Sequence, residues 1–222
     1  MKRKIILILL FLIGLSIFLV PVISGHLYEG KVNALKEEFN EIVSESEDQF
    51  EELTKRLSLE NEKLFNEGQL SFLDQSISYK VPLINLEDYG LTSNIIGFLR
   101  VPSIGVELPI YLGASDQNML QGAVHLTGTS YPIGGINTNS VIAAHRGVYK
   151  MFYYIDRIEI GDSLYIDNYK GHLEYKAIRT DIINPNDFNK LTIETGKDMV
   201  TLVSCHPFPS DHERYVVYFE RV

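Results

Sequence analysis

Three side chains in this sequence, a thiol, an imidazole and a guanidinium, are of the types that can together carry out acyl transfer. Cys205, the only cysteine among 222 residues, ends the apolar run 199–205. An ordinary thiol has a pKa of about 8.5 and is mostly protonated at neutral pH, so a nucleophilic cysteine needs a basic or cationic partner. A lone cysteine is more often a small buried apolar side chain, and both interpretations stay open at this point.

His145 is the candidate partner of the thiol, because it ends a second apolar run, 140–145. Two strands that end in Cys and His would bring these side chains together if the strands were neighbours in a barrel. The other histidines are weaker candidates. His206 adjoins the cysteine, so in an extended strand it would point to the opposite face. His26 adjoins the predicted membrane span, His172 begins a strand after a turn, and His125 could be structural. His212 lies in a loop and could reach the site, but nothing in the sequence positions it.

Acyl transfer also needs a hydrogen-bond donor for the oxyanion of the tetrahedral intermediate. Arg214 begins the last predicted strand, and segment 206–213 can fold back as a hairpin loop that places it beside Cys205. A guanidinium there could bond both the oxyanion and the scissile peptide. Arg146 is the rival, but it follows His145 directly and would fall on the other side of that strand. Either arginine could instead form a surface ion pair.

Composition excludes several classes of protein. One cysteine forms no internal disulfide, and it excludes zinc or iron sites that need several thiolates. The net charge of −9 argues against nucleic-acid binding through bulk charge. The sequence shows no carboxylate cluster that would require a metal, so no cofactor is expected. The content of 13 Tyr and 11 Phe supplies bulky core material and argues against a disordered chain.

Residues 1–28 have the pattern of a membrane anchor. Three basic residues, 2–4, precede 20 uncharged residues, 5–24, that are rich in Ile and Leu. A helix of this length rises about 30 Å, which matches the hydrocarbon core of a bilayer. The basic residues place the N-terminus in the cytoplasm and the remainder outside. A cleaved signal peptide is the alternative, since Val22 and Ser24 loosely imitate a cleavage site.

Residues 29–70 are expected to form an acidic helical stalk. This segment holds 12 acidic and 5 basic side chains, so most of the chain's negative charge lies outside the globular part. Apolar residues recur at helical spacing at positions 32, 35, 39 and 42 and again at 50, 53, 57 and 64, which predicts one helix or a helical hairpin. A stripe packed on the chain's own domain is favoured over a coiled coil, because Ser46 and Gln49 interrupt the seam.

Residues 71–94 lack a clear period and are expected to be a linker. Beyond them the pattern is typical of β structure, with predicted strands at 95–101, 106–111, 141–144, 163–166, 173–183, 199–205 and 215–220. Pro, Gly, Asn and Ser clusters separate these segments. Seven or eight strands with little helix between them predict a mainly β domain over 95–222, either a closed barrel or a sandwich.

The candidate residues lie in motifs that resemble those of the sortases, the cysteine transpeptidases of Gram-positive cell surfaces. Residues 144–147, residues 201–205 and Arg214 resemble the signature segments of that family and follow one another in the same order along the chain. Segment 129–135, which leads into 140–147, is similar to the region before the histidine in class C sortases, which polymerise pili. Segment 96–111 resembles the opening strands of that class.

The resemblance implies an eight-stranded sortase-type β-barrel in which Cys205 is the nucleophile, His145 the general acid and base, and Arg214 the stabiliser of substrate and oxyanion. It implies cleavage of an LPXTG-like sorting signal through a thioacyl-enzyme, which a lysine amine of the next pilin then resolves. The partners would be pilins and the lipid bilayer. The enzyme would lie on the outer face of the membrane of a Gram-positive bacterium.

Three features depart from the class C pattern. The residue before the nucleophile is usually Thr and is Ser204 here, which keeps a hydroxyl that we expect to contribute to substrate binding. No Asp-Pro-aromatic triplet, the usual lid, occurs between residues 68 and 93, which predicts an open site without a lid. The sequence stops directly after the last predicted strand, without the second membrane helix that many class C members carry.

Two alternatives to pilus polymerisation follow from these observations. The first is a sortase that anchors surface proteins or finished pili to peptidoglycan, with a cross-bridge amine as the acceptor. The second is a catalytically silent, membrane-tethered module whose barrel only binds pilins. The second alternative would leave Cys205 with ordinary thiol reactivity.

Overall fold

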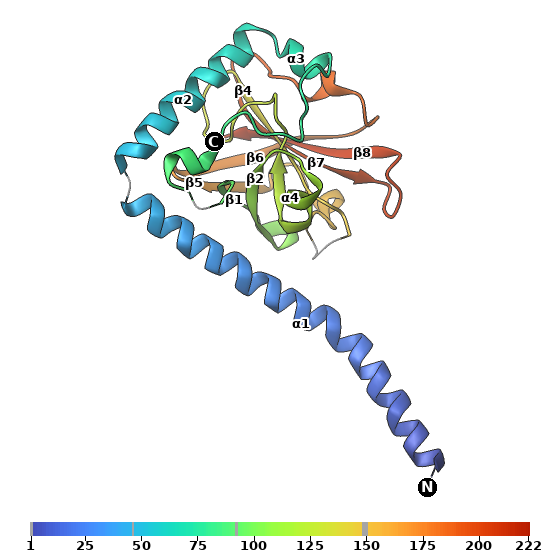
Figure 1. Ribbon diagram of the computed structural model, residues 1–222. Coiled ribbons are helices and arrows are strands. Elements are labelled where there is room, and N and C mark those ends of the chain that lie inside the picture. The colour runs from blue at the N-terminus through green and yellow to red at the C-terminus, as the bar shows by residue number, and fades with distance from the viewer. Residues whose placement is uncertain (1, 46, 92, 148–150) are drawn as a thin grey trace.

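A long helix leads into a β-barrel in the computed structural model, which describes residues 2–45, 47–91, 93–147 and 151–222 (Figure 1). Helix α1 spans Lys2–Glu45 and helix α2 spans Glu47–Asn66. Within these residues, α1 is the one helix long and apolar enough to cross a membrane, a test that a signal sequence also passes. One helix therefore continues from the predicted anchor into the predicted stalk. Ser46, a predicted break in the seam, lies outside the described residues.

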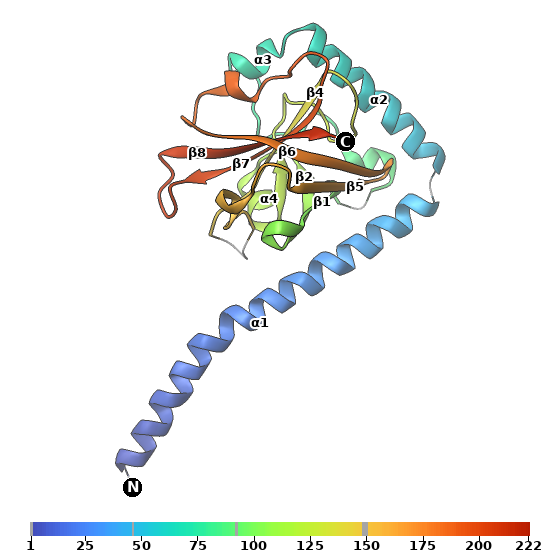
Figure 2. The ribbon, with the colours of Figure 1, turned by 180° about the vertical axis from the view of Figure 1, so that it is seen from behind.

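The stalk residues pack on the barrel, as the stripe of apolar residues predicts. Phe39 of α1 is buried and its ring meets Phe98 edge to face, with the centroids 5.6 Å apart. Leu53 and Leu57 of α2 are fully buried. Lys36 of α1 forms ion pairs with two carboxylates at the barrel surface. The apolar residues at helical spacing thus form part of the core. Helix α2 lies along one side of the barrel and the C-terminal part of α1 along another, whereas the N-terminal part of α1 extends away from it (Figures 1 and 2).

The barrel is closed and has eight strands in the order β1-β2-β3-β4-β7-β8-β6-β5. This arrangement confirms the expected closed barrel and excludes the sandwich. The strands are β1 Ile95–Val101, β2 Val106–Leu112, β3 Ala123–His125, β4 Thr138–Ala143, β5 Ser163–Asn168, β6 Gly171–Ile183, β7 Asp198–His206 and β8 Glu213–Arg221. Each predicted strand overlaps one of these, and most observed strands are one to three residues longer.

Strand β3 was not expected from the sequence. It has three residues, which is too short for an alternating pattern to stand out. It pairs in parallel with β2 and antiparallel with β4, so it closes the barrel between them. The six-residue helix α4, Asp116–Gln121, connects β2 to β3. Ser115 caps α4 by accepting a hydrogen bond from the Asn118 backbone N–H.

Segment 71–94 is more structured than a linker. Helix α3 spans Leu70–Leu73 and a 3₁₀ helix, η1, spans Leu86–Tyr89. Between them, the backbone N–H groups of Ala114 and Thr127 both donate to the Tyr79 carbonyl. Gly113 has a φ of +78°, and a Cβ there would lie 2.7 Å from the Lys80 carbonyl oxygen. Glycine therefore allows this segment to lie directly on the end of β2.

Candidate active site

Strand β7 brings Cys205 between the two other candidate residues. On one side β7 pairs antiparallel with β8, and Cys205 stands directly opposite Arg214. Directly opposed residues of an antiparallel pair project to the same face, so the thiol and the guanidinium share a face. On the other side β7 runs parallel to β4, with Val203 opposite Ala143. His145 lies two residues beyond that pair, as Cys205 lies two residues beyond Val203.

A hydrogen bond from Ser204 fixes the ends of β4 and β7 to each other. The Ser204 hydroxyl donates to the Ala144 carbonyl at 2.8 Å, and its side chain is 3% exposed. The Ala144 backbone N–H in turn donates to the Val203 carbonyl. These bonds hold the residues immediately before His145 and Cys205 side by side. The hydroxyl of Ser204 therefore positions the two chain segments, and its expected contribution to substrate binding stays a prediction.

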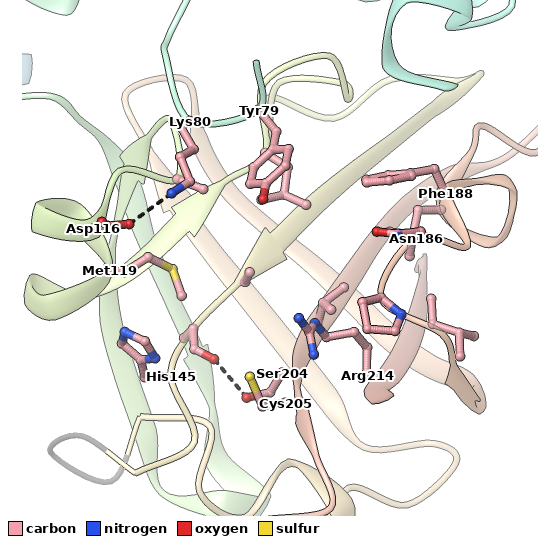
Figure 3. Close-up of a pocket in the computed structure, with 18 of the residues that line it drawn as sticks. Tyr79, Lys80, Asp116, Met119, His145, Asn186, Phe188, Ser204, Cys205 and Arg214 are labelled. Atoms are coloured by element: carbon pink, nitrogen blue, oxygen red, sulfur yellow. Dashed lines mark hydrogen bonds and ion pairs between the residues drawn. The ribbon is translucent and has the colours of Figure 1, made fainter. Parts of the chain in front are cut away.

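Cys205, His145 and Arg214 all line one cavity of about 500 Å³ (Figure 3). Cys205 is partly exposed, so its thiol is accessible from this cavity. The Arg214 side chain is held by its own loop, because its Nη1 donates to the carbonyls of Asp211 and Glu213. The fold therefore brings the three residues to one cavity, as expected from the sequence. The rest of the wall is mostly apolar, with contributions from Ala114, Met119, Leu120, Leu126, Ala143, Ile183, Pro185, Phe188, Leu191 and Val203.

The predicted linker forms part of this cavity wall. Tyr79 and Lys80 line it across from Arg214, and Lys80 forms an ion pair with Asp116 at 3.1 Å (Figure 3). The hydrogen bond with that carboxylate raises the pKa of Lys80. The sequence does not indicate this contribution, because the segment has no periodic pattern. The expected absence of a lid stays a prediction, and Tyr79 is the aromatic side chain that this segment supplies to the wall.

Arg146 does not line the cavity, but it contacts the backbone of Cys205. Its guanidinium forms an ion pair with Asp156 at 2.6 Å and donates to the Cys205 carbonyl at 3.3 Å. It also bonds Nδ1 of His206 at 3.1 Å and the Tyr153 carbonyl. The side chain is 6% exposed. The prediction that Arg146 and His206 point away from the site is confirmed, but their contact with each other was not foreseen.

Two further histidines have partners outside the cavity. His125 on β3 is buried and hydrogen-bonds the Ser130 carbonyl at 3.0 Å. Burial lowers its pKa to about 4, so its ring is neutral at physiological pH and serves the structure. His172 pairs with Asp167 at 2.5 Å on the surface. In the described part of the chain, no group of three His, Cys, Asp or Glu side chains could hold a metal ion.

Comparison with known proteins assigns the chain to a family. Residues 99–222 match the sortase domain. The chain is 29% identical to sortase D of Bacillus subtilis over 134 aligned residues. The alignment covers 59% of this chain and 66% of sortase D, just under two thirds of that protein.

Two solved structures are similar over most of their length. Sortase C1 of Streptococcus agalactiae, in complex with MTSET, is 28% identical, covers 86% of this chain and 96% of its own, and has a TM-score of 0.75. A pilus-related sortase C of group B Streptococcus is also 28% identical, covers 84% and 96%, and has a TM-score of 0.74. With its closed barrel and a matched domain that covers more than half of its length, this chain belongs to the sortase family of cysteine transpeptidases.

Proposed function

We propose that this protein is a membrane-anchored transpeptidase that cleaves an LPXTG-like sorting signal and joins it to a lysine amine of the next pilin. The observation that carries the proposal is the pairing of β7 with both β4 and β8, since it brings Cys205, His145 and Arg214 to one cavity. These side chains supply a nucleophile, a proton carrier and an oxyanion donor. The largely apolar wall suits the aliphatic residues of such a signal.

In the first half-reaction, the Cys205 thiolate attacks the carbonyl carbon of the scissile Thr–Gly bond. Arg214, which stands opposite Cys205 in the β7–β8 ladder, donates to the oxyanion of the tetrahedral intermediate. The C–N bond then breaks, and the imidazolium of His145 gives its proton to the leaving glycine amine. A thioester on Cys205 and a neutral His145 remain.

In the second half-reaction, a neutral lysine amine attacks the thioester carbonyl. His145 accepts a proton from the attacking nitrogen, and the C–S bond breaks to restore the thiolate. The product is an isopeptide bond, and the thiolate and imidazolium are ready for another cycle. One histidine can serve both steps, because it is the acid in the first and the base in the second.

The choice of acceptor rests on the relatives. The similar structures include a pilus-related sortase C, which favours a pilin lysine as the acceptor in this chain. Anchoring to peptidoglycan through a cross-bridge amine is the alternative. The apolar half of α1 would hold the enzyme in the membrane, with its N-terminus in the cytoplasm and the barrel on the outer face of a Gram-positive cell.

Purified full-length protein, supplied with a pilin that carries a sorting signal, tests this function. We expect products that contain a Thr–Lys isopeptide bond by mass spectrometry, and their loss in Cys205→Ala and His145→Ala. His172→Ala is the matched control, since this surface histidine is outside the cavity and should leave the products unchanged. Exclusive use of a cross-bridge peptide in a mixture of both acceptors would favour wall anchoring. Product formation by Cys205→Ala would refute the mechanism.

A further inference from the structure

Helix α4 contacts α1 just beyond the apolar stretch of α1. The Tyr28 hydroxyl donates to the Gln121 carbonyl, the last residue of α4, at 2.9 Å. Tyr28 is four positions after Ser24, the last residue of the predicted membrane-spanning stretch 5–24. At 1.5 Å per residue, Tyr28 lies about 6 Å along the helix axis from the end of that stretch, and its hydroxyl contacts the C-terminal end of α4.

Leu120, on the last turn of α4, lies between this junction and the catalytic cavity. It lines a second cavity, of about 290 Å³, together with Leu27 and Tyr28 of α1. It also lines the cavity that contains Cys205. Leu120 is 57% exposed and Leu27 is 70% exposed. Two large exposed apolar side chains therefore line the same small cavity, and one of them, Leu120, also lines the catalytic cavity.

The end of the barrel that carries Cys205 is the end that faces this part of α1. Strands β4 and β7 are parallel, and both reach this end at their C-termini, next to His145 and Cys205. Residues that follow β1 and residue Met151 line a third cavity with Gly25 and Tyr28 of α1. Ile136 lies before the start of β4 and therefore at the opposite end, where it borders the C-terminal half of α2.

The surroundings of α1 indicate what covers these side chains. The large apolar side chains of α1 that the structure describes between Ile5 and Ile23 are all exposed. A helix that is apolar all round is typical of a membrane span, so lipid is the partner that fits it. A surface that begins about one helical turn beyond the span falls in the headgroup layer.

We propose that the C-terminal end of α4 docks on the phospholipid bilayer, with Leu120 and Leu27 inserted at its interface. The mouth of the Cys205 cavity beside α4 then opens at the lipid surface. A polypeptide held at the membrane reaches the thiol from the lipid side, without first leaving the bilayer surface. This inference rests on the membrane-anchored part of the proposed function, and it adds a lipid-facing orientation of the active site.

The absence of tryptophan from the chain makes a direct test practical. Leu120→Trp, Leu27→Trp and Ile136→Trp each introduce a single tryptophan into the full chain, which is placed in nanodiscs that contain brominated phospholipids. We expect blue-shifted emission and strong quenching for Leu120→Trp, comparable with Leu27→Trp. Ile136→Trp is the matched control, because Ile136 is 68% exposed at the far end of the barrel and should show neither effect.

Quenching of Leu27→Trp without quenching of Leu120→Trp would overturn the proposal, and so would absence of quenching at both sites. If Leu120→Trp does not fold, a nitroxide on Leu120→Cys in the Cys205→Ala background gives the same depth by collisional relaxation. Formation of a thioester on Cys205 of the wild-type chain is measured separately with a sorting-signal peptide. If Leu120→Trp is quenched but no thioester forms on the wild-type chain, the proposed reaction is refuted and the docking stands. If the thioester forms but Leu120→Trp is not quenched, only the docking is refuted.

Discussion

His125 gives the stability of this protein a pH dependence whose size can be calculated. Its imidazole is buried on β3, and burial lowers its pKa to about 4, whereas the unfolded chain has the ordinary value of about 6.5. Between these two values the unfolded state binds a proton that the folded state does not. The free energy of unfolding therefore falls as the pH falls from 6.5 to 4, and this loss saturates below about pH 4.

The expected magnitude follows from these two pKa values. Linkage gives a loss of about 2 kcal/mol from this one histidine between pH 7 and pH 5. Urea unfolding of the full chain in a non-ionic detergent, followed by near-ultraviolet circular dichroism of the tyrosines, measures it. The variant His125→Gln has no titrating ring, so the difference in pH dependence between wild type and variant isolates the histidine from the carboxylates that titrate at lower pH.

His212→Gln is the matched control, because His212 is exposed in the β7–β8 loop. It should retain the full pH dependence of the wild type. If His125→Gln loses as much stability between pH 7 and pH 5 as the wild type does, the depressed pKa of the buried ring is refuted.

Three further predictions concern packing and positioning. Ser204→Ala should lower the free energy of unfolding by about 1 kcal/mol in urea titrations, since it removes the buried bond to Ala144, and Ser204→Thr should restore it. Leu57→Ala should cost about 2–5 kcal/mol because the side chain is fully buried in α2. The exposed Leu59→Ala should stay within about 0.5 kcal/mol in the same assay. Arg146→Lys should lower kcat more than it raises KM for a sorting-signal peptide. The reason is that the guanidinium bonds the Cys205 carbonyl from outside the cavity and so positions the thiol. A change in KM alone would contradict this role.

The sequence predicted the elements whose signals are local. Alternating apolar residues bounded by turn residues marked seven of the strands, and apolar residues at helical spacing marked the face of α2 that buries Leu53 and Leu57. The convergence of Cys205 and Arg214 also followed from local geometry, since a hairpin between two consecutive strands places their ends opposite each other. For His145, the prediction depended on β4 and β7 being neighbours, and their parallel pairing confirmed it.

Features that depend on contacts between distant segments could not be predicted. Strand β3 exists because its three residues fit between β2 and β4, and a segment this short carries no pattern of its own. The position of Tyr79 in the cavity wall depends on backbone bonds to two distant loops. Arg146 shows the same limit, because the sequence indicates that it points away from the site but not that it binds Asp156 and the backbone at Cys205.

Intact-mass analysis of the full chain after incubation with a sorting-signal peptide tests directly whether Cys205 is the nucleophile. We expect a mass increase equal to the acyl fragment that ends at Thr, located on Cys205 and released by hydroxylamine. The adduct should be absent from Cys205→Ala and should form much more slowly in Arg214→Ala. No adduct on the wild-type chain, or an adduct that persists in Cys205→Ala, would contradict the assignment of Cys205 as the nucleophile.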